Sequence, residues 1–214
     1  MSYAYIAHVL AAYIGLSADG RVVVAHLGHG ASSMCALLER RSVATTMRLT
    51  PLDGLPMGRR SGALYPGVVL YLLTQERMDA DSIRDLFYRQ GGLLGVSGLS
   101  DDMHDLLASG SAEAAEAVKL FCYRAARELS SLAAALGGLD ALVFTGGIGE
   151  NAAPVRRRIC SQAGWLGVAI DDAANDANAS DIAASGSRVA VRVVPTDEER
   201  TIARETLNYL PTPA

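Results

Sequence analysis

The sequence predicts an α/β fold in which an antiparallel hairpin unit is joined to parallel strands. Two observations support this prediction. The first quarter of the chain holds three strand patterns separated by tight turns, which is typical of antiparallel pairing. In the last half, apolar strand patterns alternate with helical ones, as in a parallel sheet. Half of the 214 residues are hydrophobic and a fifth are charged, so a packed core is expected rather than a disordered chain.

The N-terminal part begins with a helix. Apolar side chains recur at helical spacing over residues 3–14, and Gly15 ends the run. Residues 21–27 (RVVVAHL) are rich in β-branched side chains and predict a buried strand. After a glycine turn, a hairpin is expected, with a strand through about Leu38, a charged tip at Glu39, Arg40 and Arg41, and a strand over 42–47.

Helices dominate the middle of the chain. A loop rich in proline and glycine comes first, TPLDGLPMGRRSG at residues 50–62. Helical patterns then cover three segments, at about 66–75, 81–89 and 112–136. The segment GGLLGVSGLSDDM (91–103) carries turn residues and predicts a loop between the second and third of these helices.

The C-terminal part alternates strands and helices. We expect a strand at 140–144, a helix at about 152–163, a weak strand at 168–170, a polar loop at 171–187, a strand at 188–194 and a closing helix. Thr196, with Glu199 three residues later, predicts a capping box at the start of that helix. Because there is no internal repeat, linker or low-complexity tract, we expect residues 1–214 to form a single domain.

Composition excludes several classes of function. A net charge of −4 argues against general binding of nucleic acid or of an anionic membrane surface, which needs a clustered basic excess. The apolar N-terminus has no basic leader region and too short an apolar run to span a membrane. Cys35, Cys122 and Cys160 have no metal-ligand spacing and are expected as small core residues in a reducing compartment, so we predict a cytoplasmic protein.

Two glycine-rich turns are candidate ligand sites. HLGHGAS (26–32) lies between two expected strands, where glycines let backbone amides approach a phosphate; a plain hairpin turn would also favour glycine. TGGIGEN (145–151) follows a buried strand and opens a helix, at the end of an α/β sheet where ligands bind. The alternative is a turn in which glycine serves only close packing.

Two further segments carry charged candidates. Arg60 lies in the glycine-flanked loop MGRRSG, where a guanidinium suits a phosphate or carboxylate, although most loop arginines are simply solvated. PTDEE (195–199) follows the last strand, where Glu198 could hold Mg²⁺ directly or through water. Capping of the helix is the simpler interpretation of these acidic residues.

Together and in this order, the segments resemble the acetate kinase family, which includes propionate and butyrate kinases. HLGHGAS is similar to the family's HLGNGAS loop, TPLDGLPMGRRSG to TPLEGLxMGTRSG, and GLLGVSGLSDDMHDL to GxLGxSGxSxDxRDL. VFTGGIGEN matches the family's adenosine motif, and VVPTDEERTIARET resembles VIPTNEExxIARDT. The resemblance implies one ribonuclease-H-like half, with strand and helix order βββαβαβα, of the fold that acetate kinases share with sugar kinases, Hsp70 and actin.

The resemblance also implies roles for single residues. Arg60 would stabilise the transferring phosphoryl group, and Glu198 would position Mg²⁺. The nucleotide, ATP or ADP, would be bound by the phosphate turn, the segment before the long helix and the adenosine motif, through Gly28, His29, Gly30, Asp102, Met103, His104, Gly147, Ile148 and Asn151. Three departures from the family pattern stand out: His29 replaces Asn, His104 replaces Arg, and ALYP (63–66) replaces an acidic stretch.

The family carries a whole N-terminal domain before the point that matches Tyr3, where its FHG(T/S)SH signature ends. We therefore expect residues 1–214 to be the C-terminal nucleotide-binding domain alone. The parent reaction phosphorylates a short carboxylate such as acetate with Mg-ATP. Because the N-terminal domain of the family supplies half of the active site for this reaction, this chain should be weak or inactive by itself. A non-catalytic nucleotide-binding or oligomerisation module, half of a split kinase and a truncated gene product remain alternatives. The expected partners are a second copy in a homodimer or a separately encoded N-terminal half.

Overall fold

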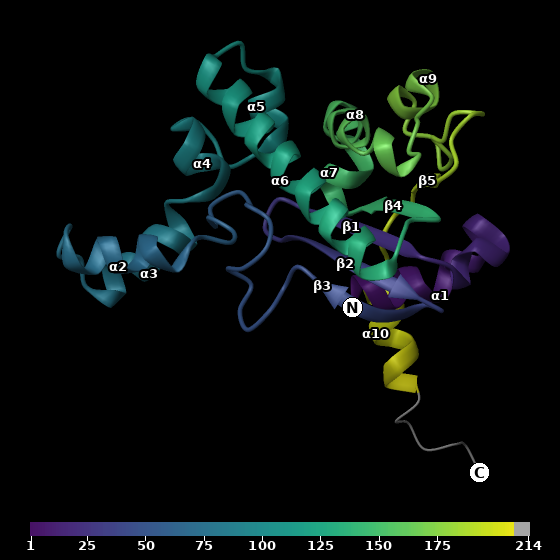
Figure 1. Ribbon diagram of the computed structural model, residues 1–214, viewed down its shortest axis with the longest axis horizontal. Coiled ribbons are helices and arrows are strands. Elements are labelled where there is room, and N and C mark those ends of the chain that lie inside the picture. Colours follow the sequence, from purple (N-terminus) through teal and green to yellow (C-terminus); the bar gives the residue numbers. More distant parts are fainter. Residues whose placement is uncertain (208–214) are drawn as a thin grey trace.

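The computed structural model describes residues 1–207 and contains one five-stranded sheet in the order β3-β2-β1-β4-β5 (Figure 1). The strands are β1 (Val22–Leu27), β2 (Ser32–Leu38), β3 (Arg41–Thr45), β4 (Ala141–Thr145) and β5 (Ala190–Val193). β1 pairs antiparallel with β2, and β2 with β3, whereas β1 and β4 are parallel, as are β4 and β5. The predicted hairpin unit joined to parallel strands is therefore confirmed.

Ten α-helices and two 3-10 turns lie in the described residues. The α-helices are α1 (Ser2–Ile14), α2 (Pro66–Thr74), α3 (Ala80–Arg89), α4 (Gly92–Ser97), α5 (Met103–Ala108), α6 (Ala112–Leu136), α7 (Gly146–Asn151), α8 (Ala153–Gln162), α9 (Asp172–Asp176) and α10 (Glu198–Leu207). The 3-10 turns are Gly15–Asp19 and Gly164–Leu166.

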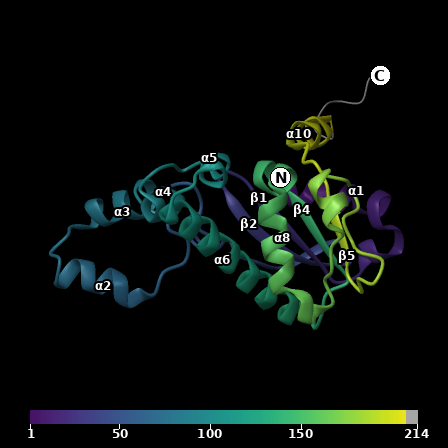
Figure 2. The same cartoon turned by 90° about the horizontal axis from the view of Figure 1, so that it is seen from above.

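Helices cover both faces of the sheet. On one face, α6 and α8 pack on a core that includes Val23, Phe121 and Leu142. On the other face, α1 packs through Ile6 and Leu10 against Val22, and α10 lies beside α1 (Figure 2). Successive residues of β1 therefore point to opposite cores, as a central strand covered on both faces requires.

Local chemistry explains the boundaries of the first strands. Gly15 ends α1 with a positive φ of 57°, which glycine adopts without steric cost. Glu39 and Arg40 form the hairpin tip with φ values of 50° and 60°, as a primed turn requires. At the same end of the sheet, where β1 begins, Arg21 donates to the Asp140 carboxylate from its Nη2 (2.6 Å) and Nε (3.0 Å), so the starts of β1 and β4 are tied together.

Several predicted boundaries are wrong. Residues 91–103 are not all loop, because they form α4 and the first residue of α5, and the glycine segment of TGGIGEN is itself the helix α7. Residues 168–170 supply a single bridge from Ile170 to Ala183 rather than a strand, and the expected loop at 171–187 contains α9. The predicted end of the closing helix beyond Leu207 lies outside the described residues.

Helices α2 and α3 project from the body of the molecule as an arm (Figures 1 and 2). α2 buries none of its residues, and its apolar side chains Leu70, Tyr71 and Leu73 are exposed. α3 is amphipathic and buries Ile83 and Phe87. The arm thus presents apolar surface that the rest of the described chain does not cover.

Along residues 1–207, none of the helices combines the length and the apolar character needed to cross a membrane. The three cysteines are free and buried, as predicted. Burial raises the pKa of Cys122 to about 11 and that of Cys160 to about 12, so both thiols are neutral at physiological pH and unsuited to nucleophilic attack.

Candidate functional site at the carboxyl ends of the parallel strands

The parallel strands end at one edge of the sheet and bring three loops together there. His26 is the register partner of Thr145, and Phe144 is that of Val193. The turn after β1, the helix α7 after β4 and the segment after β5 are therefore neighbours, although 46 residues separate Glu150 from Thr196 along the chain. Open α/β sheets bind ligands at this edge.

The turn after β1 is closed by its own hydrogen bonds. The Gly28 N–H donates to the Ala31 carbonyl (3.0 Å) and to Ser32 Oγ (3.2 Å), and Ser32 Oγ donates to the Gly28 carbonyl (2.8 Å). Among the described residues, no acceptor is found for the N–H groups of His29 and Gly30. An anion at this turn would therefore meet the amides of His29 and Gly30 rather than that of Gly28.

The loop that carries Arg60 lies against this turn. Gly58 donates its N–H to the His29 carbonyl (3.2 Å), and a Cβ at Gly58 would come within 2.9 Å of the Asp101 carbonyl. Arg60 Nη1 reaches the Gly30 carbonyl at 3.4 Å, so the structure brings this predicted residue to the glycine turn.

Asp101 connects Arg59 and His29 at the turn. Its carboxylate accepts from Arg59 Nε at 2.6 Å and lies 3.7 Å from His29 Nε2. The hydrogen bond from Arg59, with smaller contributions from its charge and that of His29, holds the pKa of Asp101 below its usual range. Asp101 is therefore charged at neutral pH.

A pocket of about 290 Å³ opens beside the turn. It is lined by seven of the predicted nucleotide-binding residues, namely His29, Asp102, Met103, His104, Gly147, Ile148 and Asn151, together with Leu107, Ala152 and Pro154. The lining is largely apolar with a few polar groups, the composition typical of small-molecule sites. Within it, the Asp102 carboxylate accepts from the His104 N–H (2.8 Å) and caps α5.

Helix α7 packs directly on the end of β1. Gly146 has a φ of 80°, and a Cβ there would lie 2.8 Å from the Leu27 carbonyl oxygen and 3.1 Å from His26 Cε1. Only glycine fits this position. The close contact places α7 so that Gly147, Ile148 and Asn151 line the pocket, and Asn151 Nδ2 donates to the Gly147 carbonyl (3.0 Å).

His26 and Tyr3 form a half-buried cluster that sequence reasoning missed. Their rings meet edge to face with centroids 6.5 Å apart, and Tyr3 shares a 2.5 Å hydrogen bond with Ser33. Burial lowers the pKa of His26, which the nearby carboxylates of Glu198 and Glu150 oppose. His26 Nδ1 is buried without a partner among the described residues, and its place at the end of β1 is the one signal that could have indicated it.

Glu198 begins α10 next to α1. The Ser2 hydroxyl donates to its carboxylate, so the first helix of the chain contacts the predicted magnesium ligand. The prediction that Thr196 caps α10 is wrong, because Asp197 accepts from the Arg200 N–H (2.8 Å) and acts as the cap instead. The hydroxyl of Thr196 is buried without a partner in the described part of the chain.

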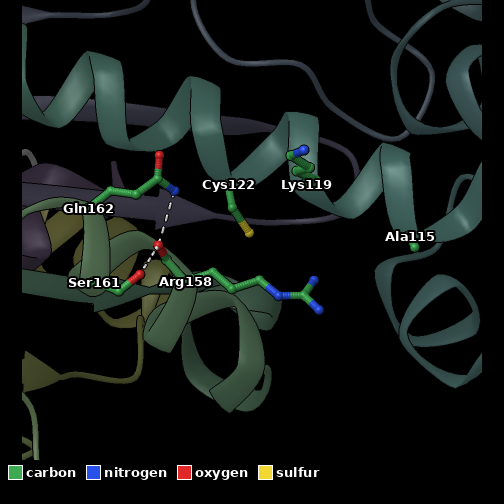
Figure 3. A pocket seen from close by; sticks show the side chains of 6 residues that line it. All are labelled: Ala115, Lys119, Cys122, Arg158, Ser161 and Gln162. Carbon is green, nitrogen blue, oxygen red and sulfur yellow. Dashed lines mark hydrogen bonds between the residues drawn. The ribbon is translucent and has the colours of Figure 1, made fainter.

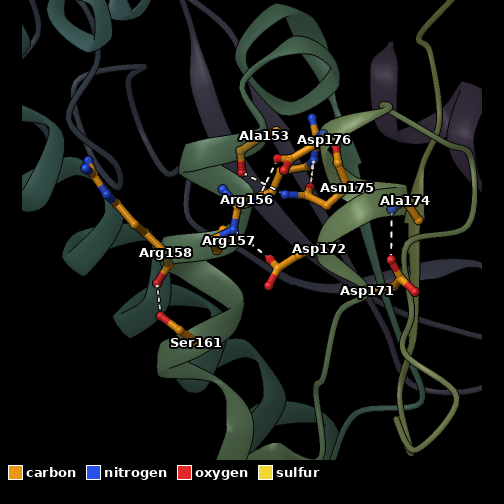
Figure 4. Close-up of polar contacts among 10 residues, drawn as sticks. All are labelled: Ala153, Arg156, Arg157, Arg158, Ser161, Asp171, Asp172, Ala174, Asn175 and Asp176. Atoms are coloured by element: carbon orange, nitrogen blue, oxygen red, sulfur yellow. Dashed lines mark hydrogen bonds and ion pairs between the residues drawn. The ribbon is translucent and has the colours of Figure 1, made fainter.

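The far end of α7 is fixed by a fully buried arginine. Arg156 donates to the carbonyls of Gly149 and Glu150 (both 2.9 Å) and to Asn175 Oδ1 (2.8 Å). The neighbouring Arg157 pairs with Asp172, so α7, α8 and α9 form one polar network (Figure 4). Burial is the main cause that lowers the pKa of Arg156, and the hydrogen bonds explain how its charge is tolerated.

A second cavity of about 310 Å³ lies away from the strand ends, between α6 and α8 (Figure 3). Lys119 and Arg158 line it together with the inert thiol of Cys122. None of the predicted site residues reaches it.

The comparison with known proteins identifies the chain's family. A profile described as the acetokinase family matches residues 1–204. The chain belongs to the acetokinase family. It is 62% identical over 207 residues to an acetate kinase of Rhodopseudomonas palustris, with 95% of this chain and 52% of the relative covered. An acetate kinase of Methylocella silvestris is 54% identical over 210 residues, covering 98% of this chain and 52% of that protein.

Solved structures agree with this assignment. The chain resembles an acetate kinase of Porphyromonas gingivalis with a TM-score of 0.91 at 36% identity, and a propionate kinase of Francisella tularensis with a TM-score of 0.91 at 38% identity. Each comparison covers 98% of this chain and 54% of the other. The predicted fold class and family are thus confirmed, and this acetokinase-family chain spans about half the length of the relatives it matches.

Proposed function

We propose that the chain forms the nucleotide-binding half of a kinase that transfers the γ-phosphoryl group of ATP reversibly to a short carboxylate such as acetate, giving an acyl phosphate and ADP. The observation that carries the proposal is the meeting of the glycine turn, Arg60 and an apolar pocket at one edge of the sheet. The names of the relatives, acetate kinases and a propionate kinase, supply the substrate class.

The nucleoside would occupy the 290 Å³ pocket, with Met103 and Ile148 against the base and Asp102, His104, Gly147 and Asn151 at its polar edge. The phosphates would then extend to the turn of Gly28, His29 and Gly30. The free amides of His29 and Gly30 and the guanidinium of Arg60 are suited to binding phosphate there.

Arg60 would lie at the transferring group, where its guanidinium neutralises the charge that develops on the phosphoryl oxygens. Among the described residues, no cluster of three potential metal-binding side chains exists. A single carboxylate still fits Mg²⁺, because this ion is usually held by one or two carboxylates together with substrate phosphates. Glu198 would hold it, and the bound ion would offset phosphate charge.

The groups that bind the carboxylate would belong to the half of the relatives that this chain does not match. In-line transfer needs groups on both sides of the reacting phosphoryl group. We therefore expect little kinase activity from the 214-residue chain, in keeping with a half of a split kinase in the cytoplasm. Turnover in an acyl-hydroxamate assay equal to that of a full-length relative would contradict this expectation.

Isothermal titration with ADP and Mg²⁺ tests the nucleotide site directly. Gly147 lines the pocket and a Cβ there meets open space, so Gly147→Leu should fill the pocket without strain and abolish binding. Gly164 is equally unobstructed but lies in the 3-10 turn after α8, so Gly164→Leu is the matched control and should bind as the wild type does. Absence of ADP binding by the wild type at millimolar ligand would overturn the proposed function.

The exposed arm favours a second role, oligomerisation. Leu70, at 61% exposure, and Tyr71, at 54%, face outward from α2, and contiguous apolar surface of this kind marks interaction sites. The arm and α1 lie at opposite ends of the molecule, and a separately encoded N-terminal half would have to meet the chain near α1 (Figure 2). We therefore propose a second copy of this chain as the partner of the arm.

A further inference from the structure

The carboxylate of Glu150 links two of the site's loops. Its Oε1 accepts from the Gly146 N–H (2.8 Å) and the Thr145 hydroxyl (3.4 Å), both within its own segment. The same oxygen accepts from the Thr196 N–H (3.1 Å), in the segment after β5. One atom thus joins the helix that lines the nucleotide pocket to the segment that carries Glu198.

The other bonds at these positions show why this link matters. The hydroxyl of Thr196 is buried without a partner in the described chain, so the backbone N–H to Glu150 is the polar tie of that residue. The backbone of Glu150 is itself held by Arg156, which is 0% exposed and donates to its carbonyl. The carboxylate therefore extends from a rigid base.

The segment after β5 is held by β4 at Val194 and by a hydroxyl of α1 at Glu198, and Thr196 is the point at which it is joined to α7. Val194 donates to the Phe144 carbonyl (2.9 Å), and two residues later Thr196 meets Glu150. Glu198 follows after a further two residues, in the first turn of α10. A shift at Thr196 would thus displace the Glu198 carboxylate relative to α7.

We propose that Glu150 is a positioning residue that sets the Glu198 carboxylate relative to the nucleotide pocket, so that the nucleotide and Mg²⁺ are bound as one unit. This inference rests on the proposed function. In this role Glu150 accepts backbone N–H groups and would not itself contact the nucleotide or the metal. The role requires one side-chain oxygen that accepts two N–H groups, so the carbonyl oxygen of a glutamine at this position can perform it.

The test is titration of ADP with and without Mg²⁺, and the quantity compared is the ratio of the two dissociation constants. We call the factor by which Mg²⁺ tightens ADP binding the Mg²⁺ enhancement. Glu150→Ala should reduce this enhancement by about tenfold, the size expected for loss of coupling between neighbouring groups. Glu150→Gln should retain most of it. Glu116, exposed on α6, provides the matched control Glu116→Ala, which should leave the ratio unchanged.

A double-mutant cycle sharpens the result. In Glu198→Ala the enhancement should already be lost, so adding Glu150→Ala should change the ratio no further. Amide hydrogen exchange gives a readout that needs no ligand, in which Glu150→Ala should speed exchange at Gly146 and Thr196 together.

Each failure has its own signature. Equal loss of ADP affinity with and without Mg²⁺ in Glu150→Ala would overturn the inference and leave the nucleotide site intact as a proposal. Loss of the enhancement in Glu150→Gln as complete as in Glu150→Ala would also overturn it, since the charge rather than the position would then matter. A wild type that binds no ADP would remove the proposed function and this inference together.

Discussion

At the scale of single residues, His26 makes the free energy of unfolding depend on pH. Burial lowers its pKa, so in the window between the lowered pKa and the ordinary value near 6.5 the unfolded chain binds more protons than the folded one. The contribution of His26 to stability is therefore complete above pH about 6.5 and falls as the pH drops through that window.

Urea unfolding of the wild type and His26→Asn at pH about 5 and about 7.5 measures this effect. The stability advantage of the wild type over the variant should be smaller at the acidic pH, because the variant has no imidazole to protonate. His8 is exposed on α1, and His8→Asn serves as the control. An advantage that grew on acidification would show that His26 is bound as the cation.

Residues on the loops that follow the strands could be predicted from the sequence, whereas residues that hydrogen-bond to a distant segment could not. The turns that contain His29 and Ile148 were predicted as ligand sites because each is rich in glycine and directly follows a strand pattern, and the resemblance to the family supplied the individual residues. Glu150 was missed as a link, since its partner Thr196 is 46 residues away and nothing local marks a side chain that accepts a distant N–H. The same holds for Tyr3, whose partner Ser33 lies 30 residues on.

At the scale of elements, Arg156 holds three helices together. Replacement by lysine would leave several of the carbonyl and amide oxygens of α7, α9 and Asn178 without donors, because an ammonium cannot match the guanidinium fork. We expect Arg156→Lys to lower the free energy of unfolding by about 3 kcal/mol or more, as for other broken buried networks.

Chemical denaturation measures this change, with Arg158→Lys as the control. Arg158 lies two residues away on α8 and is exposed, so its replacement should alter stability by less than about 0.5 kcal/mol. Equal stability of the two variants would mean that the network contributes nothing that a lysine cannot supply.

Element length decided how well the fold could be predicted. The 25 residues of α6 were predicted to the residue, since a long amphipathic pattern with serine before it and glycine after it leaves little ambiguity. α4 and α7 have six residues each and several glycines, so their composition indicates turns and only their packing on neighbouring elements makes them helical.

At the scale of the whole molecule, the arm should control association. Leu70→Glu places a charge on the exposed face of α2 and should shift the chain from dimer to monomer in light scattering after size exclusion, without loss of fold. Leu49 is 97% exposed outside the arm, so Leu49→Glu should leave the dimer intact. A wild type that is monomeric at all concentrations would contradict the proposed partner.

The position of β1 in the sheet has a consequence for the order of folding. β1 is the first strand of the chain and the central one of the sheet, yet its parallel partner β4 begins only at Ala141. The hairpins β1–β2–β3 can close early because their loops are short, whereas β4 must await more than half of the chain during synthesis. Pulse-labelled hydrogen exchange during refolding should show β2 amides protected before those of β4. Until β4 pairs with β1, one side of β1 remains an unpaired edge. The nascent chain is therefore most prone to aggregate during that interval.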